Sequence, residues 1–404
     1  MASILRADRD LVATAAMSLV YSASLAMLTI TLPLLALAAH YSRPLIGVLT
    51  ALSAVTQLAS RLGSAKAMRR VTDRNVVAGA CFTIAVSALV LVWSHQVVLF
   101  VIAELIQGLA RGMFWTGTQA HVVRSRRKAV GRLATVNFVS SFGLLAGPPI
   151  AGVLSARSFA TALWVAAALG LTSAVMAATL MSRLDVFATP SSGPRQKVWS
   201  YPGVRVGCWA GTTAGAWRGL VGSYIPVALR AASESSTLVG IMVGVANGAS
   251  LVGTASMGVI GSRRTRATFA AGVLAAGAGV ALTGITAHQA VLVAAFIALS
   301  GIGAGMLQTL GPATAATAVE MDRRGDAVAV AGSFRAGALF VSPLGTAALL
   351  DVTSLPAALL IAGALLGLPV LSAARSKDWQ WKLDAQKSDA QKSSDDRLPA
   401  NPKR

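Results

Sequence analysis

Charged residues are scarce in this chain of 404 residues, and acidic ones are especially few. Asp and Glu number 15 against 35 Lys and Arg, and the four types together make up 12% of the sequence. A basic surface that binds nucleic acid needs a polar, soluble face, which this composition does not supply. We therefore expect no nucleic-acid partner, although the formal net charge is +20.

Cysteine and histidine are rare as well. Cys81 and Cys208 lie near the ends of separate apolar segments, where burial and a reducing compartment argue against a disulfide. The four histidines are far apart in the sequence, and there is no Gly-Lys-Ser/Thr loop, His-Glu-x-x-His sequence or closely spaced cysteine pair. We therefore expect no metal, no cofactor and no enzymatic activity.

Hydrophobic residues are abundant, at 55%, and they are concentrated in segments long enough to cross a bilayer. One helical crossing takes about 20 apolar residues. The pattern predicts an all-α membrane protein with twelve transmembrane helices. The segments are 11–39, 44–62, 75–93, 96–122, 130–154, 159–181, 204–229, 236–260, 267–287, 289–319, 327–350 and 353–373.

The basic residues are unevenly divided between the two sides of this arrangement. Of the 35, 29 lie at the termini or in the even-numbered connections, whereas the odd-numbered connections hold only Arg43, Arg157 and Arg230. Lys and Arg accumulate on the cytoplasmic side of membrane proteins. We therefore predict a multi-pass protein of the cell membrane with both termini in the cytoplasm.

Two features divide the chain into halves. The connection 182–203 is rich in Pro, Ser and Gly and is predicted to be a cytoplasmic linker between six-helix halves at 1–181 and 204–375; the polar residues 376–404 are predicted to form a disordered tail. The run from Gly108 to Thr116 matches that from Gly301 to Thr309 at the two Gly, the Met and the Thr positions. The match indicates that the two halves are an internal duplication.

The fifth segment carries the most specific motif, Gly143-Leu-Leu-Ala-Gly147-Pro148-Pro149-Ile-Ala151-Gly152. It resembles the antiporter motif G-x-x-x-G-P-x-x-G-G of the major facilitator superfamily, with Ala151 in place of one glycine. The resemblance covers the chain up to the tail and implies a secondary transporter whose halves alternate in access, with export as the direction. Small residues four apart allow close helix approach, so we expect this face to move against segment 236–260.

Two other superfamily motifs are degraded. The loop pattern G-x-L-x-D-R-x-G-R-R keeps only its basic character, with Met68 or Arg69 at the position of its acid and Asp73 as a shifted substitute. The pattern R-x-x-Q-G reads Glu104-Leu-Ile-Gln107-Gly108, so a carboxylate stands where relatives carry an arginine. The proton step of those relatives therefore does not transfer directly.

Charges inside the predicted membrane segments are the main candidates for function, because each costs roughly 2.5–3.5 kcal/mol to insert. Glu104, the only acid well inside a segment, is the candidate for proton coupling, with a static ion pair as the alternative. The resemblance places Arg111 and Arg218 at a central cavity, where they would bind an anionic group unless Glu104 or helix carbonyls satisfy them. Arg335 lies nearer a segment end and is expected to extend to the cytoplasmic surface.

We predict a proton-coupled exporter of a small organic compound, such as a drug or metabolite. The alternative is a proton-coupled importer of an organic anion or metabolite, and a non-transporting sensor or enzyme is less favoured. The expected partners are the substrate, protons and the lipid bilayer, and we expect a monomer. Further residues predicted to line the substrate site are Trp115, Trp217, Tyr21, Gln107, Asn247 and Gln308.

Overall fold

The structure is a computed structural model in which residues 2–68, 70–93, 96–124, 129–184, 198–232, 234–260, 265–319 and 323–371 are described. Throughout these ranges the regular structure is helical, and they contain no strand. The predicted tail 376–404 and most of the predicted linker 182–203 lie outside the described residues.

The helices follow the predicted segments closely. Their bounds are α1 Ala2–Ala38, α2 Arg43–Ala67, α3 Asp73–Val90, α4 Val97–Arg124, α5 Ala129–Arg157, α6 Phe159–Leu180, η1 Val198–Ser200, α7 Pro202–Val221, α8 Tyr224–Ala231, α9 Ser236–Ile260, α10 Thr265–Ile285, α11 Ala290–Thr317, α12 Arg324–Leu350 and α13 Leu355–Gly367. The predicted twelve-crossing, all-helical fold is confirmed, with one difference. The seventh segment is broken after Val221, so α7 and α8 together make one crossing.

Nine of the described helices are long and apolar enough to span a membrane on their own. The three remaining crossings are less regular. α13 has only 13 residues, the α7–α8 crossing is interrupted, and α2 contains Arg43 and Arg61. Charges and breaks of this kind weaken a hydropathy signal, although the protein tolerates them where neighbouring helices cover them.

Glycines set the spacing of the inner helices in the same way in both parts of the chain. A Cβ at Gly108 or Gly112 of α4 would collide with the backbone of Ser53 or Gln57 on α2. A Cβ at Gly301 or Gly305 of α11 would likewise collide with Ala246 or Ser250 on α9. The sequence repeat between 108–116 and 301–309 therefore corresponds to a repeated helix contact, α2 with α4 and α9 with α11.

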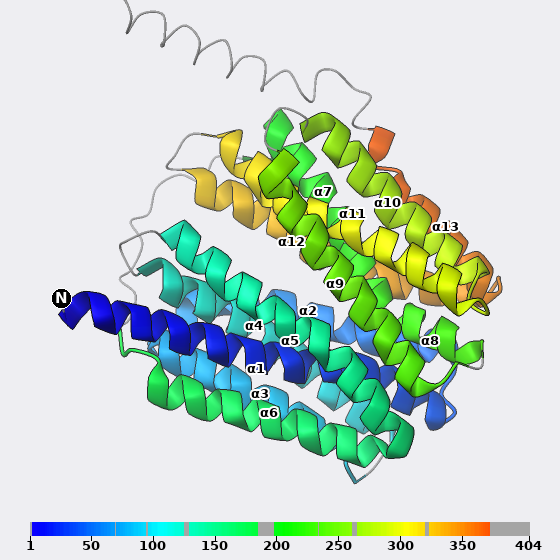
Figure 1. Cartoon of the computed structure of the whole chain (residues 1–404), viewed down its shortest axis with the longest axis horizontal. Coiled ribbons are helices and arrows are strands. Elements are labelled where there is room, and N and C mark those ends of the chain that lie inside the picture. Colours follow the sequence, from blue (N-terminus) through cyan, green and yellow to red (C-terminus); the bar gives the residue numbers. More distant parts are fainter. Residues whose placement is uncertain are drawn as a thin grey trace, which may run out of the picture.

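Helices α1 to α6 and helices α7 to α13 form two groups that lie one beside the other (Figure 1). The largest contacts between the groups are those of α5 with α9 and of α2 with α12. Several close approaches lie toward the odd-numbered connections: Gly152 meets Ser236 and Gly240, and the hydroxyl of Tyr224 donates to the carbonyl of Arg43 at 3.2 Å. The two halves are thus joined at the end that holds the odd connections.

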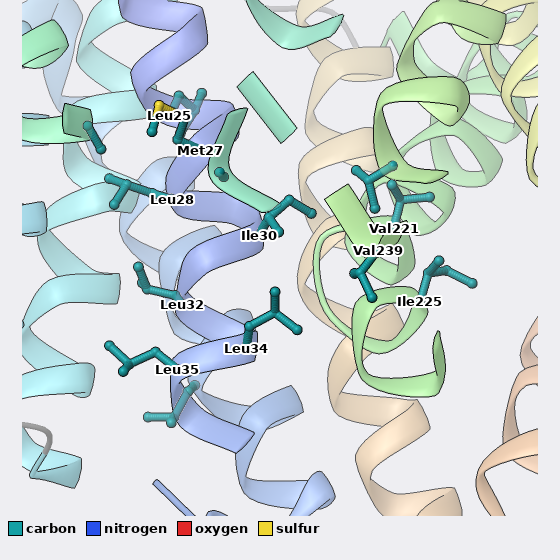
Figure 2. Close-up of a cluster of buried hydrophobic side chains, with 14 of the residues drawn as sticks. Leu25, Met27, Leu28, Ile30, Leu32, Leu34, Leu35, Val221, Ile225 and Val239 are labelled. Carbon is teal, nitrogen blue, oxygen red and sulfur yellow. The ribbon is translucent and has the colours of Figure 1, made fainter. Parts of the chain in front are cut away.

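An apolar core continues this junction along α1. Ile30 and Leu34, both at most 2% exposed, lie on the side of α1 that faces Val221, Ile225 and Val239 of the second half (Figure 2). Leu28, Leu32 and Leu35 lie on the opposite side, within the first half. Helix α1 therefore packs into both halves at once, and the charged residues described next lie on the helices that surround this junction.

Candidate functional site

One face of α4 presents three polar side chains at intervals of three and four residues. Glu104 is 5% exposed and Gln107 is 2% exposed, and the guanidinium of Arg111 donates to the amide oxygen of Gln107. Glu104 and Arg111 interact electrostatically, but they do not form an ion pair within the described residues. The Oε2 of Glu104 is buried and has no hydrogen-bond partner among the described residues, and the hydroxyl of Ser53 on α2 donates to the carbonyl of Thr50 at 2.8 Å.

Arg218 of α7 is hydrogen-bonded to a side chain of the second half, and that side chain is hydrogen-bonded to the first half. Its Nη1 donates to Oδ1 of Asn247 on α9 at 2.6 Å. The Nδ2 of Asn247 in turn donates to the carbonyl of Leu144 on α5 at 2.9 Å. Asn247 is therefore bonded on both sides, and its neutral amide connects the arginine to the opposite half.

Arg335 of α12 has a comparable partner. Its Nη2 donates to Oε1 of Gln308 on α11 at 3.1 Å, and Nε2 of Gln308 lies 3.2 Å from the hydroxyl of Ser250 on α9. The expectation that Arg335 extends along its helix to the cytoplasmic surface is wrong, because its guanidinium is bonded between helices. Position along a helix was a poor guide here, since the rotation of α12 decides which way the side chain points.

These three arginines interact electrostatically with one another or with a fourth arginine. Arg218 interacts electrostatically with both Arg111 and Arg335, and Arg335 interacts with Arg61 of α2. We call Arg61, Arg111, Arg218 and Arg335 the arginine cluster. Two members come from each half, and three of them are bonded to the side-chain amides of Gln107, Asn247 and Gln308. Amide oxygens orient a guanidinium but do not neutralise it, so the cluster keeps a net positive charge beside the carboxylate of Glu104.

The predicted aromatic residues separate into two groups. Tyr21 stacks on Phe114, with ring centroids 3.6 Å apart, and Phe114 meets Trp115 edge to face at 5.2 Å. Tyr21 is fully buried and lies within electrostatic range of Arg111, while Trp115 is half-buried. Trp217, in contrast, is 1% exposed and donates from Nε1 to the hydroxyl of Ser300 at 3.0 Å. The structure thus brings Tyr21 and Trp115 near the cluster and packs Trp217 between α7 and α11.

The antiporter-like motif faces two different helices. Cβ atoms at Gly143 and Gly147 would collide with the α1 backbone at Leu19 and Ala23, whereas one at Gly152 would meet Ser236 and Gly240 of α9. The expectation that the whole small-residue face lies against segment 236–260 is therefore only partly correct. Gly143 and Gly147 pack on α1, whereas Leu144, Leu145, Pro148, Pro149 and Gly152 lie against α9.

A second polar cluster was missed by the sequence analysis. Nδ1 of His121 lies 3.1 Å from Oδ2 of Asp73, and Nε2 lies 3.0 Å from Oδ2 of Asp10. The other oxygen of Asp10 accepts from the backbone N–H of Ser182 at 2.7 Å. We call His121, Asp10 and Asp73 the His121 bridge; it connects α1, α3, α4 and the end of α6. With both ring nitrogens facing carboxylates, an imidazolium that donates from each satisfies the geometry.

Comparisons with known proteins agree with the geometry. The family model described as Major Facilitator Superfamily matches residues 14–217. Among solved structures, 262 chains match, and one of them is the crystal structure of a point mutant of the nucleoside transporter NupG. That likeness has a TM-score of 0.76 at 11% identity and covers 90% of this chain and all of NupG, so it shows the fold alone. No curated protein matches the sequence.

Proposed function

Because the chain belongs to the major facilitator superfamily and is a membrane transporter by that membership, we propose that it moves a small organic anion across the cell membrane together with a proton. The observation that carries this proposal is the arginine cluster, which keeps its positive charge while its hydrogen bonds fix its geometry. A membrane interior strongly disfavours such charge unless a counter-ion or water compensates it. An anionic substrate is a natural counter-ion.

Arginine is well suited to this task. Its guanidinium presents several N–H donors in a planar fork that matches carboxylate or phosphate oxygens. Gln107, Asn247 and Gln308 each occupy part of one guanidinium and set its orientation. Because Arg111 and Arg61 belong to the first half and Arg218 and Arg335 to the second, an anion among them would contact both halves. Contact with both halves is what substrate-dependent switching requires.

Glu104 is the proposed proton site. It is buried, lies within electrostatic range of Arg111, and has an oxygen with no hydrogen-bond partner among the described residues. When no substrate is bound, Arg111 favours the ionised carboxylate. An anion that binds Arg111 would compete for that charge and would favour protonation of Glu104 instead. Linkage is reciprocal, so protonation of Glu104 would also strengthen binding of the anion.

This linkage bears on the direction of transport. Joint binding of anion and proton makes the protein a symporter, and an inward proton gradient then drives uptake. Export, the direction implied by the antiporter-like motif, is the second candidate. We favour uptake because the direction follows from the groups that would bind the transported species, which are Glu104 and Arg111. Gly143, Gly147 and Gly152 contact the backbones of α1 and α9 and therefore bear on helix packing.

A ligand search on the purified protein tests the substrate class. Pairs of organic anions and neutral analogues of the same size, such as a carboxylate and its amide, would be screened for their effect on thermal stability. A ligand that binds only the folded state raises stability by RT ln(1 + [L]/Kd). We expect stabilisation by members of the anionic set. Stabilisation by neutral analogues to the same extent would contradict the proposed role of the arginine cluster.

A further inference from the structure

A pocket lies between the two halves at the end that holds the odd-numbered connections. Its volume is about 650 Å³, within the range of small-molecule sites. The first half contributes Arg43 of α2, Ser155 and Arg157 at the end of α5, and Ser158 before α6. The second half contributes Arg230 of α8 and Ser236 of α9. We call it the odd-end pocket, and it is separate from the arginine cluster.

All three arginines of the odd-numbered connections line this one pocket. Their side chains are exposed, and within the described part of the chain none of them forms an ion pair with Asp or Glu. Arg230 donates from Nη1 to the carbonyl of Glu234 at 2.9 Å, which orients it without neutralising it. The convergence is notable because the distribution of Lys and Arg otherwise avoids this side of the membrane.

Helix termini of both kinds meet at the pocket. Three helices begin at the pocket: α2 at Arg43, α6 at Phe159 after the cap residue Ser158, and α9 at Ser236. The first turn of a helix has free N–H groups and the positive end of the helix dipole, and both favour anions. Three other helices end at the pocket, α1 at Ala38, α5 at Arg157 and α8 at Ala231, and their negative dipole ends oppose this effect. The net positive charge of the pocket therefore comes from its three arginines.

A buried hydroxyl points to a ligand independently of the charges. Ser155 is 6% exposed and lines the pocket, and its Oγ is buried with no hydrogen-bond partner among the described residues. A buried hydroxyl without a partner costs free energy, so such groups normally have one. An anion held by the arginines would offer an acceptor to this hydroxyl.

We propose that the odd-end pocket binds an anion with a phosphate or carboxylate group, and that the bound anion holds the two halves together at this end. The reason lies in the division of the ligands: Arg43 and Arg157 belong to one half and Arg230 to the other. Opening at this end would separate Arg230 from the other two arginines. The anion therefore has a higher affinity for the closed arrangement and shifts the population toward it.

This site acts on the conformational equilibrium and does not depend on Glu104 or on the substrate of the arginine cluster. The anion can be dissolved phosphate or carboxylate, or the phosphate of a lipid headgroup, because the chemistry that binds them is the same. In either case the bound anion would inhibit opening on the side that is predicted to be extracellular.

The test measures the distance between the halves in the full-length protein. Val98→Cys and Val291→Cys place spin labels on exposed positions at the odd ends of α4 and α11, while the native Cys81 and Cys208 are buried. Distance distributions would be recorded in detergent with inorganic phosphate or with chloride at equal ionic strength. A second arm uses nanodiscs of neutral phosphatidylcholine or of anionic phosphatidylglycerol without added phosphate.

We expect phosphate, anionic lipid or both to increase the short-distance population. If dissolved phosphate acts in detergent, the ligand is a soluble anion; if only phosphatidylglycerol acts, it is a lipid headgroup. Arg230→Gln should raise the half-maximal phosphate or lipid level about tenfold, the factor that corresponds to about 1.4 kcal/mol. Arg230→Lys, which keeps the charge, should raise the half-maximal level by a smaller factor.

Two control variants make the outcome decisive. Arg183→Gln changes an exposed arginine at the opposite end and should leave the response unchanged. Arg218→Gln removes an arginine of the central cluster, and the response should also survive there. The proposal is overturned if the wild-type distances respond to neither anion, or if Arg230→Gln, Arg43→Gln and Arg157→Gln all respond as the wild type does. Neither result would affect the proposed transport of an anion at the arginine cluster.

Discussion

Replacing Arg218 by glutamine should weaken the binding of anionic ligands much more than the binding of neutral ones. The side chain makes a 2.6 Å bond to Asn247, and Asn247 keeps its own bond to the Leu144 carbonyl, so the local helix contacts have support without the arginine. What Arg218→Gln removes is a positive donor from the cluster. A hydrogen bond to a charged group contributes about 1.5–3 kcal/mol, which corresponds to roughly 10- to 150-fold in affinity.

The assay is competition binding on the purified variant with an anionic ligand and its neutral analogue. We expect the affinity for the anion to fall about 10- to 150-fold and the affinity for the neutral analogue to fall less than about threefold. Arg218→Lys should fall between wild type and Arg218→Gln, because an ammonium supplies charge without the planar fork. Thermal stability of each variant serves as the folding control. Equal losses for the charged and the neutral ligand would refute the assignment of Arg218 to anion binding.

Three further variants test other parts of the account. Glu104→Gln should abolish the proton dependence of transport while substrate exchange at equal pH remains, and a normal pH-driven accumulation would make Glu104 structural. Gly147→Ala should lower the melting temperature, since its Cβ meets Ala23 and Ala26 at 2.7 Å, whereas Gly345→Ala, with open space around it, should not; equal melting temperatures would rule out tight α1–α5 packing at Gly147. His121→Ala should destabilise the fold by about 3–5 kcal/mol because two carboxylates lose the imidazolium that lies between them; unchanged thermal unfolding would show that the His121 bridge contributes little.

The sequence was sufficient to predict the helices and several of the charged positions. Apolar length and the grouping of basic residues define the crossings because the bilayer sets a length and the headgroup region a charge preference. The Gly108 and Gly301 runs correctly indicated repeated packing, since glycines at helix contacts leave a pattern in the sequence. The break after Val221 left a weaker signal, because α7 and α8 both remain apolar.

Contacts between side chains were harder to predict because they depend on how each helix is rotated. Arg335 was expected at the membrane surface, but α12 turns it toward Gln308. Trp217 is adjacent to Arg218 in sequence, yet it faces Ser300, since neighbours on a helix point about 100° apart. The His121 bridge joins residues separated by 48 and 111 positions in the sequence, and no local sequence motif indicates such an arrangement.

Proton movement during anion flux is the most direct test of the central claim. Purified protein would be reconstituted into liposomes that contain a pH-sensitive dye, and an inward gradient of an anion identified by the ligand search would be imposed with the membrane potential clamped. Symport through Glu104 and the arginine cluster predicts that the interior becomes more acidic at a rate that follows anion uptake, and that Glu104→Gln uncouples the two. An interior that becomes more alkaline would establish antiport, and anion uptake with no change of internal pH would contradict proton coupling altogether.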